Sequence, residues 1–200
     1  MLLPAVAIGF HGCDLEVGEK VLSGAQEIHP SENPYDWLGR GAYFWEGDPH
    51  RAKAWAEYLR NNPAASRSKI KTPFVVGAII KLGSCLDLTH SAHLEIVRAA
   101  YDELLETFKL AEKPFPENQP AGKGDADLVR RFRDRLVLDY VHEARQRDKK
   151  HAFDTVRASF PEGDALYEGA KITEKSHVQI CVRKSHSILG YFRPIWNRYA

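Results

Sequence analysis

The sequence predicts an α+β fold built as a single domain over residues 1–200. Patterns typical of strands occupy both ends of the chain, and patterns typical of helices occupy its middle, between residues 91 and 150. A chain of this length can bury one full hydrophobic core and is short for two. The Pro- and Gly-rich stretch AEKPFPENQPAGKGD separates two helical patterns and therefore predicts a loop.

The composition is that of an ordinary soluble globular protein, with 44% hydrophobic and 28% charged residues. The net charge of +1 gives no overall electrostatic basis for binding nucleic acid or a membrane. The apolar N-terminus MLLPAVAIGF lacks the basic segment of a signal peptide, and no apolar run is long enough to span a bilayer. Three cysteines, Cys13, Cys85 and Cys181, without a C-x-x-C pair favour a reduced cytoplasmic protein without disulfides or structural zinc.

The first strand is expected in VAIGFHGCD, which contains a His-Gly pair. Glycine near a strand end lets a ligand approach the backbone closely, so His11 and Gly12 indicate part of a binding site. A turn after an edge strand explains the same pair equally well.

The segment GRGAYFWEGDPHRAKAWA, residues 39–56, predicts a strand that runs into a helix. AYFW is typical of a strand, Asp48 is placed to cap the helix, and Pro49 suits its first position. Tyr43 on the strand and Trp55 on the helix could form two walls of a slot for a planar heteroaromatic ring. Both could instead be core aromatics, and their spacing alone favours that alternative.

The middle of the chain repeats apolar side chains at helical spacing, first in SAHLEIVRAAYDELLETF and then in DADLVRRFRDRLVLDYVHEARQRDKK. Ser91 is expected to cap the first helix, and Leu128 to lie on the apolar face of the second. His90 and His93 have no apparent third ligand, so no metal site is predicted. Acidic residues interrupt the basic side chains of the second helix, which indicates a solvated helix face rather than an RNA-binding one.

The last clear strand is SHVQICVR, in which apolar and polar residues alternate. Val178, Ile180 and Val182 predict the face on the core. The other face carries His177, Gln179, Cys181 and Arg183, and it is expected to line either solvent or a cleft.

Three of these segments, in this order, resemble the ADP-ribosyltransferase superfamily of the poly(ADP-ribose) polymerase and diphtheria-toxin type, whose signature is a His-Tyr-Glu triad. FHG is similar to the first motif, with His11, and GRGAYF to the second, with Tyr43. QICVRKSHSILGYF is similar to the third-motif strand, with Gln179 where the family has Glu. The resemblance covers residues 5–90 and 150–195. It implies split mixed β-sheets around an NAD cleft, with residues 91–150 as a helical insertion.

The resemblance also implies a site. His11, Tyr43 and Gln179 would be catalytic, and Tyr43 and Trp55 would cover the two faces of the nicotinamide ring. Gly12 would bind the carboxamide, His11 the adenosine ribose, and Arg40 or Arg51 the pyrophosphate. The residues expected to bind NAD are His11, Gly12, Asn33, Arg40, Gly41, Tyr43, Arg51 and Trp55. Candidate carboxylates outside the third motif are Glu46 and, in the loop before the last strand, Glu162, Glu168 and Glu174.

Gln179 limits the activity that the resemblance implies. Cleavage of the nicotinamide–ribose bond passes through an oxocarbenium-like state, which a nearby carboxylate stabilises. An amide can bind the ribose through hydrogen bonds, but it carries no charge and cannot act as a general base. Elongation of ADP-ribose chains is therefore not expected.

Three functions remain open at this point. The first is a mono-ADP-ribosyltransferase or NAD glycohydrolase, of the kind found among bacterial or phage effectors and toxins. The second is a catalytically silent module that binds NAD or another nucleotide, and the third is an RNA 2'-phosphotransferase-like enzyme. NAD is the expected substrate, with no metal. The expected partners are a protein or nucleic-acid acceptor and, for a toxin, an antitoxin or immunity protein, but no membrane.

Overall fold

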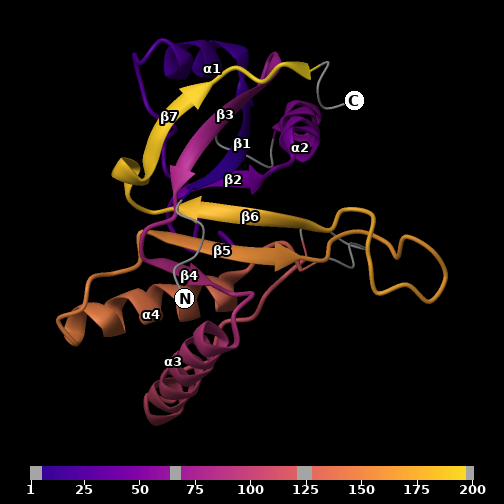
Figure 1. Cartoon of the computed structure of the whole chain (residues 1–200). Coiled ribbons are helices and arrows are strands. Elements are labelled where there is room, and N and C mark those ends of the chain that lie inside the picture. Colours follow the sequence, from indigo (N-terminus) through magenta and orange to yellow (C-terminus); the bar gives the residue numbers. More distant parts are fainter. Residues whose placement is uncertain (1–5, 64–68, 121–127, 197–200) are drawn as a thin grey trace.

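The structure is a computed structural model that describes residues 6–63, 69–120 and 128–196. The described elements follow in the order β1 (Val6–Asp14), α1 (Leu15–Leu22), β2 (Ala42–Glu46), α2 (Pro49–Asn61), β3 (Pro73–Lys81), β4 (Cys85–Asp87), α3 (Ser91–Leu110), α4 (Phe132–Arg147), β5 (Thr155–Phe160), β6 (His177–Val182), the short 3-10 helix η2 (Ser185–Ser187) and β7 (Ile188–Phe192). Strands from both ends of the chain share a sheet, and the two longest helices lie between β4 and β5 (Figure 1). This arrangement agrees with the predicted α+β class.

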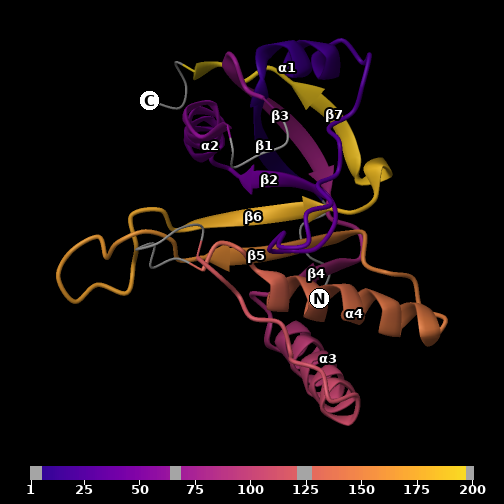
Figure 2. The ribbon, with the colours of Figure 1, turned by 180° about the vertical axis from the view of Figure 1, so that it is seen from behind.

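The seven described strands form one mixed sheet in the order β4-β5-β6-β2-β1-β3-β7. β4 and β5 are parallel, and the other neighbours are antiparallel. Figures 1 and 2 show that β4, β5 and β6 lie at a steep angle to β1, β3 and β7. β1 and β2, which join the two halves, pair only at Gly9↔Glu46 and Phe10↔Trp45. The expected split into separate sheets is therefore a bend within one continuous sheet.

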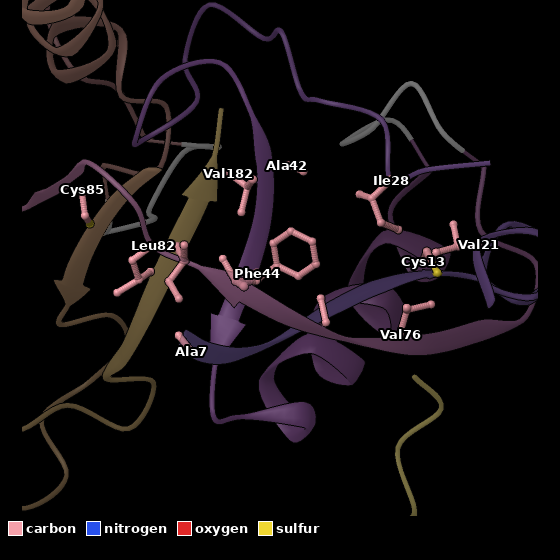
Figure 3. Close-up of a cluster of buried hydrophobic side chains, with 13 residues drawn as sticks. Ala7, Cys13, Val21, Ile28, Ala42, Phe44, Val76, Leu82, Cys85 and Val182 are labelled. Carbon is pink, nitrogen blue, oxygen red and sulfur yellow. The ribbon is translucent and has the colours of Figure 1, made fainter. Parts of the chain in front are cut away.

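Hydrophobic side chains cover both faces of this sheet. Phe44 and Ile180 pack on one face with Val21 of α1, and Figure 3 shows this cluster with side chains from β1, β3 and β6. Cys181, the next residue in β6, packs on the other face with Leu104 of α3 and Val141 of α4. A third cluster lies under α2 and contains Phe10, Trp45, Ala52 and Val75.

α2 begins as the sequence predicts. Asp48 accepts a hydrogen bond from the backbone N–H of Arg51 at 2.9 Å, and Pro49 is the first helical residue. The helix packs directly on β1, where a Cβ atom on Gly12 would lie far inside van der Waals contact with the carbonyl oxygen of Ala52. Gly12 is therefore required for the close approach of helix and strand.

Two expectations about the helical middle are wrong in detail. Ser91 is the first residue of α3 rather than its cap, and His90 precedes the helix without a side-chain capping bond. α4 begins only at Phe132, and Leu128 is exposed outside it. The reason is that Gln119 and Arg130 exchange two backbone hydrogen bonds, which keep the chain extended before the helix.

The second face of β6 is partly packed into the core: His177 and Cys181 are buried, and Gln179 and Arg183 are half-buried. His177 is 8% exposed and Cys181 is fully buried, because β6 lies between β5 and β2 and the helices cover it. All three cysteines are buried and free. Burial raises the pKa of the Cys181 thiol to about 12, so the thiol stays protonated and Cys181 acts as a packing residue. No described helix is both long enough and apolar enough to cross a membrane.

Candidate functional site

His11 lies where β1 and β2 separate. The two strands pair at Phe10↔Trp45, and just beyond this point His11 Nδ1 lies 2.8 Å from the carbonyl oxygen of Tyr43. A carbonyl can only accept, so Nδ1 carries the proton and Nε2 is the acceptor of the ring. Burial lowers the pKa of His11, which keeps the ring neutral. The ring of His11 lies 5.7 Å from that of Phe44, on the face of the sheet opposite Trp45, so the structure does not bring His11 together with Trp55.

Tyr43 is half-buried against the core, and its hydroxyl has hydrogen-bond partners. Its oxygen accepts a hydrogen bond from the N–H of Leu38 at 2.8 Å and donates one to the carbonyl of Gly39 at 2.7 Å. The ring packs against the cluster beneath α3 and α4. The ring contacts of Trp55 in the described structure are with Trp45 and Tyr58. Tyr43 and Trp55 are therefore not brought together as the two walls of a slot.

The hydroxyl of Tyr43 should contribute measurably to stability. We expect Tyr43→Phe to lower the free energy of unfolding by about 1–3 kcal/mol, because it leaves the buried N–H of Leu38 without its acceptor. Urea denaturation monitored by circular dichroism measures this difference. Stability equal to that of the wild type would show that the two hydrogen bonds are not maintained in solution.

An aromatic cluster lies on the face of the sheet that also carries Gln179. We define it by Trp37, Trp45, Trp55, Phe160 and His177, which come from the segment before β2, from β2, α2, β5 and β6. The rings of Trp37 and Phe160 are 4.5 Å apart, and those of Trp45 and Trp55 are 6.2 Å apart. His177 lies between the two pairs, 6.4 Å from both Trp37 and Trp45. Trp55, which is 42% exposed, is the part of the cluster that faces solvent.

A charged group borders the aromatic cluster. Arg51 of α2 donates a hydrogen bond to Glu162 at 2.8 Å, and both side chains are largely buried. Glu162 also lies 3.8 Å from Nδ1 of His177. The backbone N–H of Lys175 donates to the carbonyl of Glu162 at 2.9 Å, which closes the base of the loop before β6. Figure 1 shows this loop, residues 161–176, extending beyond the sheet.

Three buried nitrogen atoms of this site have no hydrogen-bond partner among the described residues: Trp45 Nε1, Arg51 Nε and His177 Nε2. His177 Nδ1 donates to the carbonyl of Lys175 at 2.6 Å, and burial lowers the pKa of the ring, so Nε2 is an unprotonated acceptor. The other two atoms are donors. Because an unpaired buried polar atom costs about 1–3 kcal/mol, bound water or a ligand is expected to supply two acceptors and one donor to these three atoms.

Gln179 lies beside this group. It is opposite Trp45 in the pairing of β2 and β6, and it is two residues from His177 on the same face of β6. Glu162, through its position near His177, is the candidate carboxylate on this side of the sheet. Glu46 is on the other face, where Arg157 binds it at 2.6 and 3.3 Å and also binds buried Asp87.

The remaining predicted residues lie apart from these side chains. Arg40 is exposed and pairs with Glu32 at 2.6 Å. Asn33 donates to Ser31 and Asp36, and thereby shapes the loop before β2. Three other predicted residues also lie outside the group around Arg51. Gly41 packs against β6, and Glu168 and Glu174 are exposed.

The sequence interpretation missed Trp45, Trp37 and Phe160 and gave His177 no role. In the sequence, Trp45 is the last apolar residue of the strand pattern AYFW, and Trp37 lies in the turn before it. Alternation along β2 offered a signal, because Trp45 shares the face of Tyr43 one step closer to α2. Among the described residues, no three potential ligands are arranged to hold a metal ion.

Comparison with known proteins gives one relative. The chain is similar to uncharacterized protein MJ0359 of Methanocaldococcus jannaschii, with 27% identity over 191 residues that cover 87% of this chain and 80% of that protein. No family model matches the chain, and no solved structure matches it.

Proposed function

We propose that the protein is an NAD-dependent mono-ADP-ribosyltransferase or NAD glycohydrolase. The observation that carries this proposal is the set of three unpartnered buried nitrogen atoms, of Trp45, Arg51 and His177, next to Gln179 and Glu162. A nucleotide with a planar base and an anionic linker carries acceptors for the two donor nitrogens and donors for His177 Nε2. His11 lies beside Phe44 on the other face of the sheet and has no part in this group.

In this proposal, each side chain contacts a different part of NAD. Trp55, which is 42% exposed and stacked with Tyr58, would contact the nicotinamide ring through its exposed part, and this replaces the pairing of Tyr43 with Trp55. Arg51 supplies the positive charge for the pyrophosphate, as the sequence predicts. Its guanidinium already pairs with Glu162, so the ligand and that carboxylate would share it.

Glu162 can supply the charge that Gln179 lacks. In the reaction, the bond between ribose C1' and the nicotinamide nitrogen breaks, and the bonding electrons leave with neutral nicotinamide. A carboxylate beside the ring stabilises the positive charge that develops on the ribose. The incoming hydroxyl of water or of an acceptor then bonds to C1' and gives its proton to Glu162 as general base. The Gln179 amide can hold a ribose hydroxyl during this step.

The release of nicotinamide tests the proposal. We expect the wild-type protein to release nicotinamide from NAD and Glu162→Gln to be slower by about 10²–10³-fold, the usual effect of losing one group that stabilises the transition state. Gln179→Ala should also lower the rate. Glu168→Gln is the matched control, since it makes the same chemical change at an exposed position of the same loop. Chromatography of the reaction at saturating NAD measures all four rates.

Two results would contradict the proposal. Wild-type rates in Glu162→Gln would remove Glu162 from the mechanism, and calorimetry that detects no NAD binding would remove the function altogether. NAD binding without nicotinamide release would favour the second candidate function, a silent NAD-binding module. The amide of Gln179 at the position of the family's Glu is the observation that favours this alternative.

A further inference from the structure

A hollow of about 470 Å³ lies where α4 ends, β5 begins and β6 ends. It is at the opposite end of β6 from His177, and Figure 1 shows that end of the β5–β6 pair beside the end of α4. The side chains that line this hollow are mainly hydrogen-bond donors or groups that can become donors: Gln146, Lys150, His151, Lys184 and His186, together with one carboxylate, Asp154.

The positive charge at this corner is local. Residues 145–151 and 183–186 contain six lysines and arginines against one aspartate, whereas the whole chain has a net charge of only +1. Lys150, His151, Lys184 and His186 are all exposed. Lys150 lies 3.4 Å from Asp148, but an ion pair between two exposed side chains contributes little, so the ammonium group remains available to a ligand.

The carboxylate of the hollow is engaged within the protein. Asp154 accepts a hydrogen bond from the backbone N–H of Ser84 at 2.9 Å, and its other oxygen lies 4.0 Å from Nε2 of His186. The carbonyl of Asp154 accepts the backbone N–H of Arg183 at 2.9 Å, which joins the start of β5 to the end of β6. Asp154 therefore acts as part of the frame, and the lysines dominate the charge presented to solvent.

The turn that carries Lys150 and His151 is held in place. The guanidinium of Arg145 lies 4.0 Å from the centre of the Phe153 ring, and its Nε donates to the carbonyl of His151 at 2.9 Å. The N–H of Lys150 donates to the carbonyl of Arg145 at 2.8 Å. The lysine and histidine thus project from an ordered backbone, which lowers the entropic cost of binding an anion.

We propose that this corner binds phosphate groups in the backbone of a nucleic acid. Ammonium, imidazole and amide groups are suited to phosphate oxygens. The hollow is larger than one phosphate group, and Lys150 and Lys184 line it from two separate segments, so the surface fits linked phosphates better than one small anion. No Phe, Tyr or Trp is among the described residues that line it, so the binding should depend on charge and not on base sequence.

Fluorescence anisotropy with a labelled single-stranded RNA of mixed sequence, in the absence of NAD, tests this proposal. We expect Lys150→Gln/Lys184→Gln to weaken binding on the order of tenfold at low salt and to reduce the slope of log K against log salt by about 1.4, or 0.7 for each lost contact. Lys20→Gln/Lys71→Gln is the matched control, because it removes the same charge near α1 and should leave binding unchanged. All four lysines are exposed, so every variant should fold.

Three outcomes would overturn the proposal. The first is equal loss of binding in both double variants, which would show only a general charge effect. The second is that inorganic phosphate binds while the RNA does not. The third is that a polyglutamate peptide binds as tightly as the RNA. Because NAD is absent from the assay, none of these results depends on whether the protein cleaves NAD.

Discussion

Replacing Gly12 by alanine is expected to lower the free energy of unfolding by about 3 kcal/mol, at the upper end of the cost of overpacking. The added methyl group would overlap the carbonyl oxygen of Ala52 and approach the side chain of Ala56, both on α2. Backbone atoms of a helix cannot move aside as a flexible side chain can, so α2 as a whole must shift. Urea denaturation monitored by circular dichroism measures the loss.

The control for this prediction is Gly190→Ala on β7. A Cβ atom at Gly190 would meet no heavy atom within 4 Å, so its effect should stay within about 0.5 kcal/mol. If Gly12→Ala were as stable as this control, the contact between β1 and α2 would be looser than described. The variant also bears on the proposed function. A shift of α2 would move Arg51 and Trp55 together, so NAD binding should weaken even though Gly12 has no side chain.

Local chemistry made α2 predictable. The cap at Asp48, the proline at the first helical position and the strand before them are all determined within about a dozen consecutive residues. The start of α4 was not predictable in this way. It depends on two hydrogen bonds between Gln119 and Arg130, which are separated by a loop, and sequence periodicity carries no information about such a pairing.

In the candidate site, too, features set by neighbouring residues were predictable and features set by distant segments were not. The sequence indicated Arg51 and Glu162 as candidate residues, and these two pair in the structure. It did not predict which aromatic side chains face each other. Trp45, one position beyond Phe44, lies beside Trp55 and His177, while Tyr43 is drawn into the core by α3 and α4. Those helices lie between residues 91 and 150, outside the three motifs, so the motifs alone could not indicate their effect on Tyr43.

Acid should destabilise the protein through His142, a residue of α4 that is 3% exposed. Neither ring nitrogen has a hydrogen-bond partner among the described residues. Burial, followed by repulsion from Arg183, Arg145 and Arg135, lowers the pKa of His142 to about 3. The unfolded chain takes up a proton near pH 6.5, whereas the folded protein does not, so stability is complete above that pH and falls as the pH drops towards 3.

The size of this effect follows from the proton that only the unfolded chain binds. Between pH 7 and pH 5, we expect the free energy of unfolding to fall by about 2 kcal/mol through His142 alone. Burial also lowers the pKa of His11 and of His177, and these two residues act in the same direction. Urea denaturation at a series of pH values gives the profile.

His142→Leu identifies the residue responsible. Leucine fills a similar volume beside Phe153 and removes two buried polar atoms that lack partners, so the variant should be at least as stable as the wild type at pH 7. At pH 5 it should retain about 2 kcal/mol that the wild type loses. His29→Leu makes the same change at an exposed position and should keep the wild-type profile. If His142→Leu lost as much stability as the wild type between pH 7 and pH 5, the acid sensitivity would have to come from the other two buried histidines, His11 and His177.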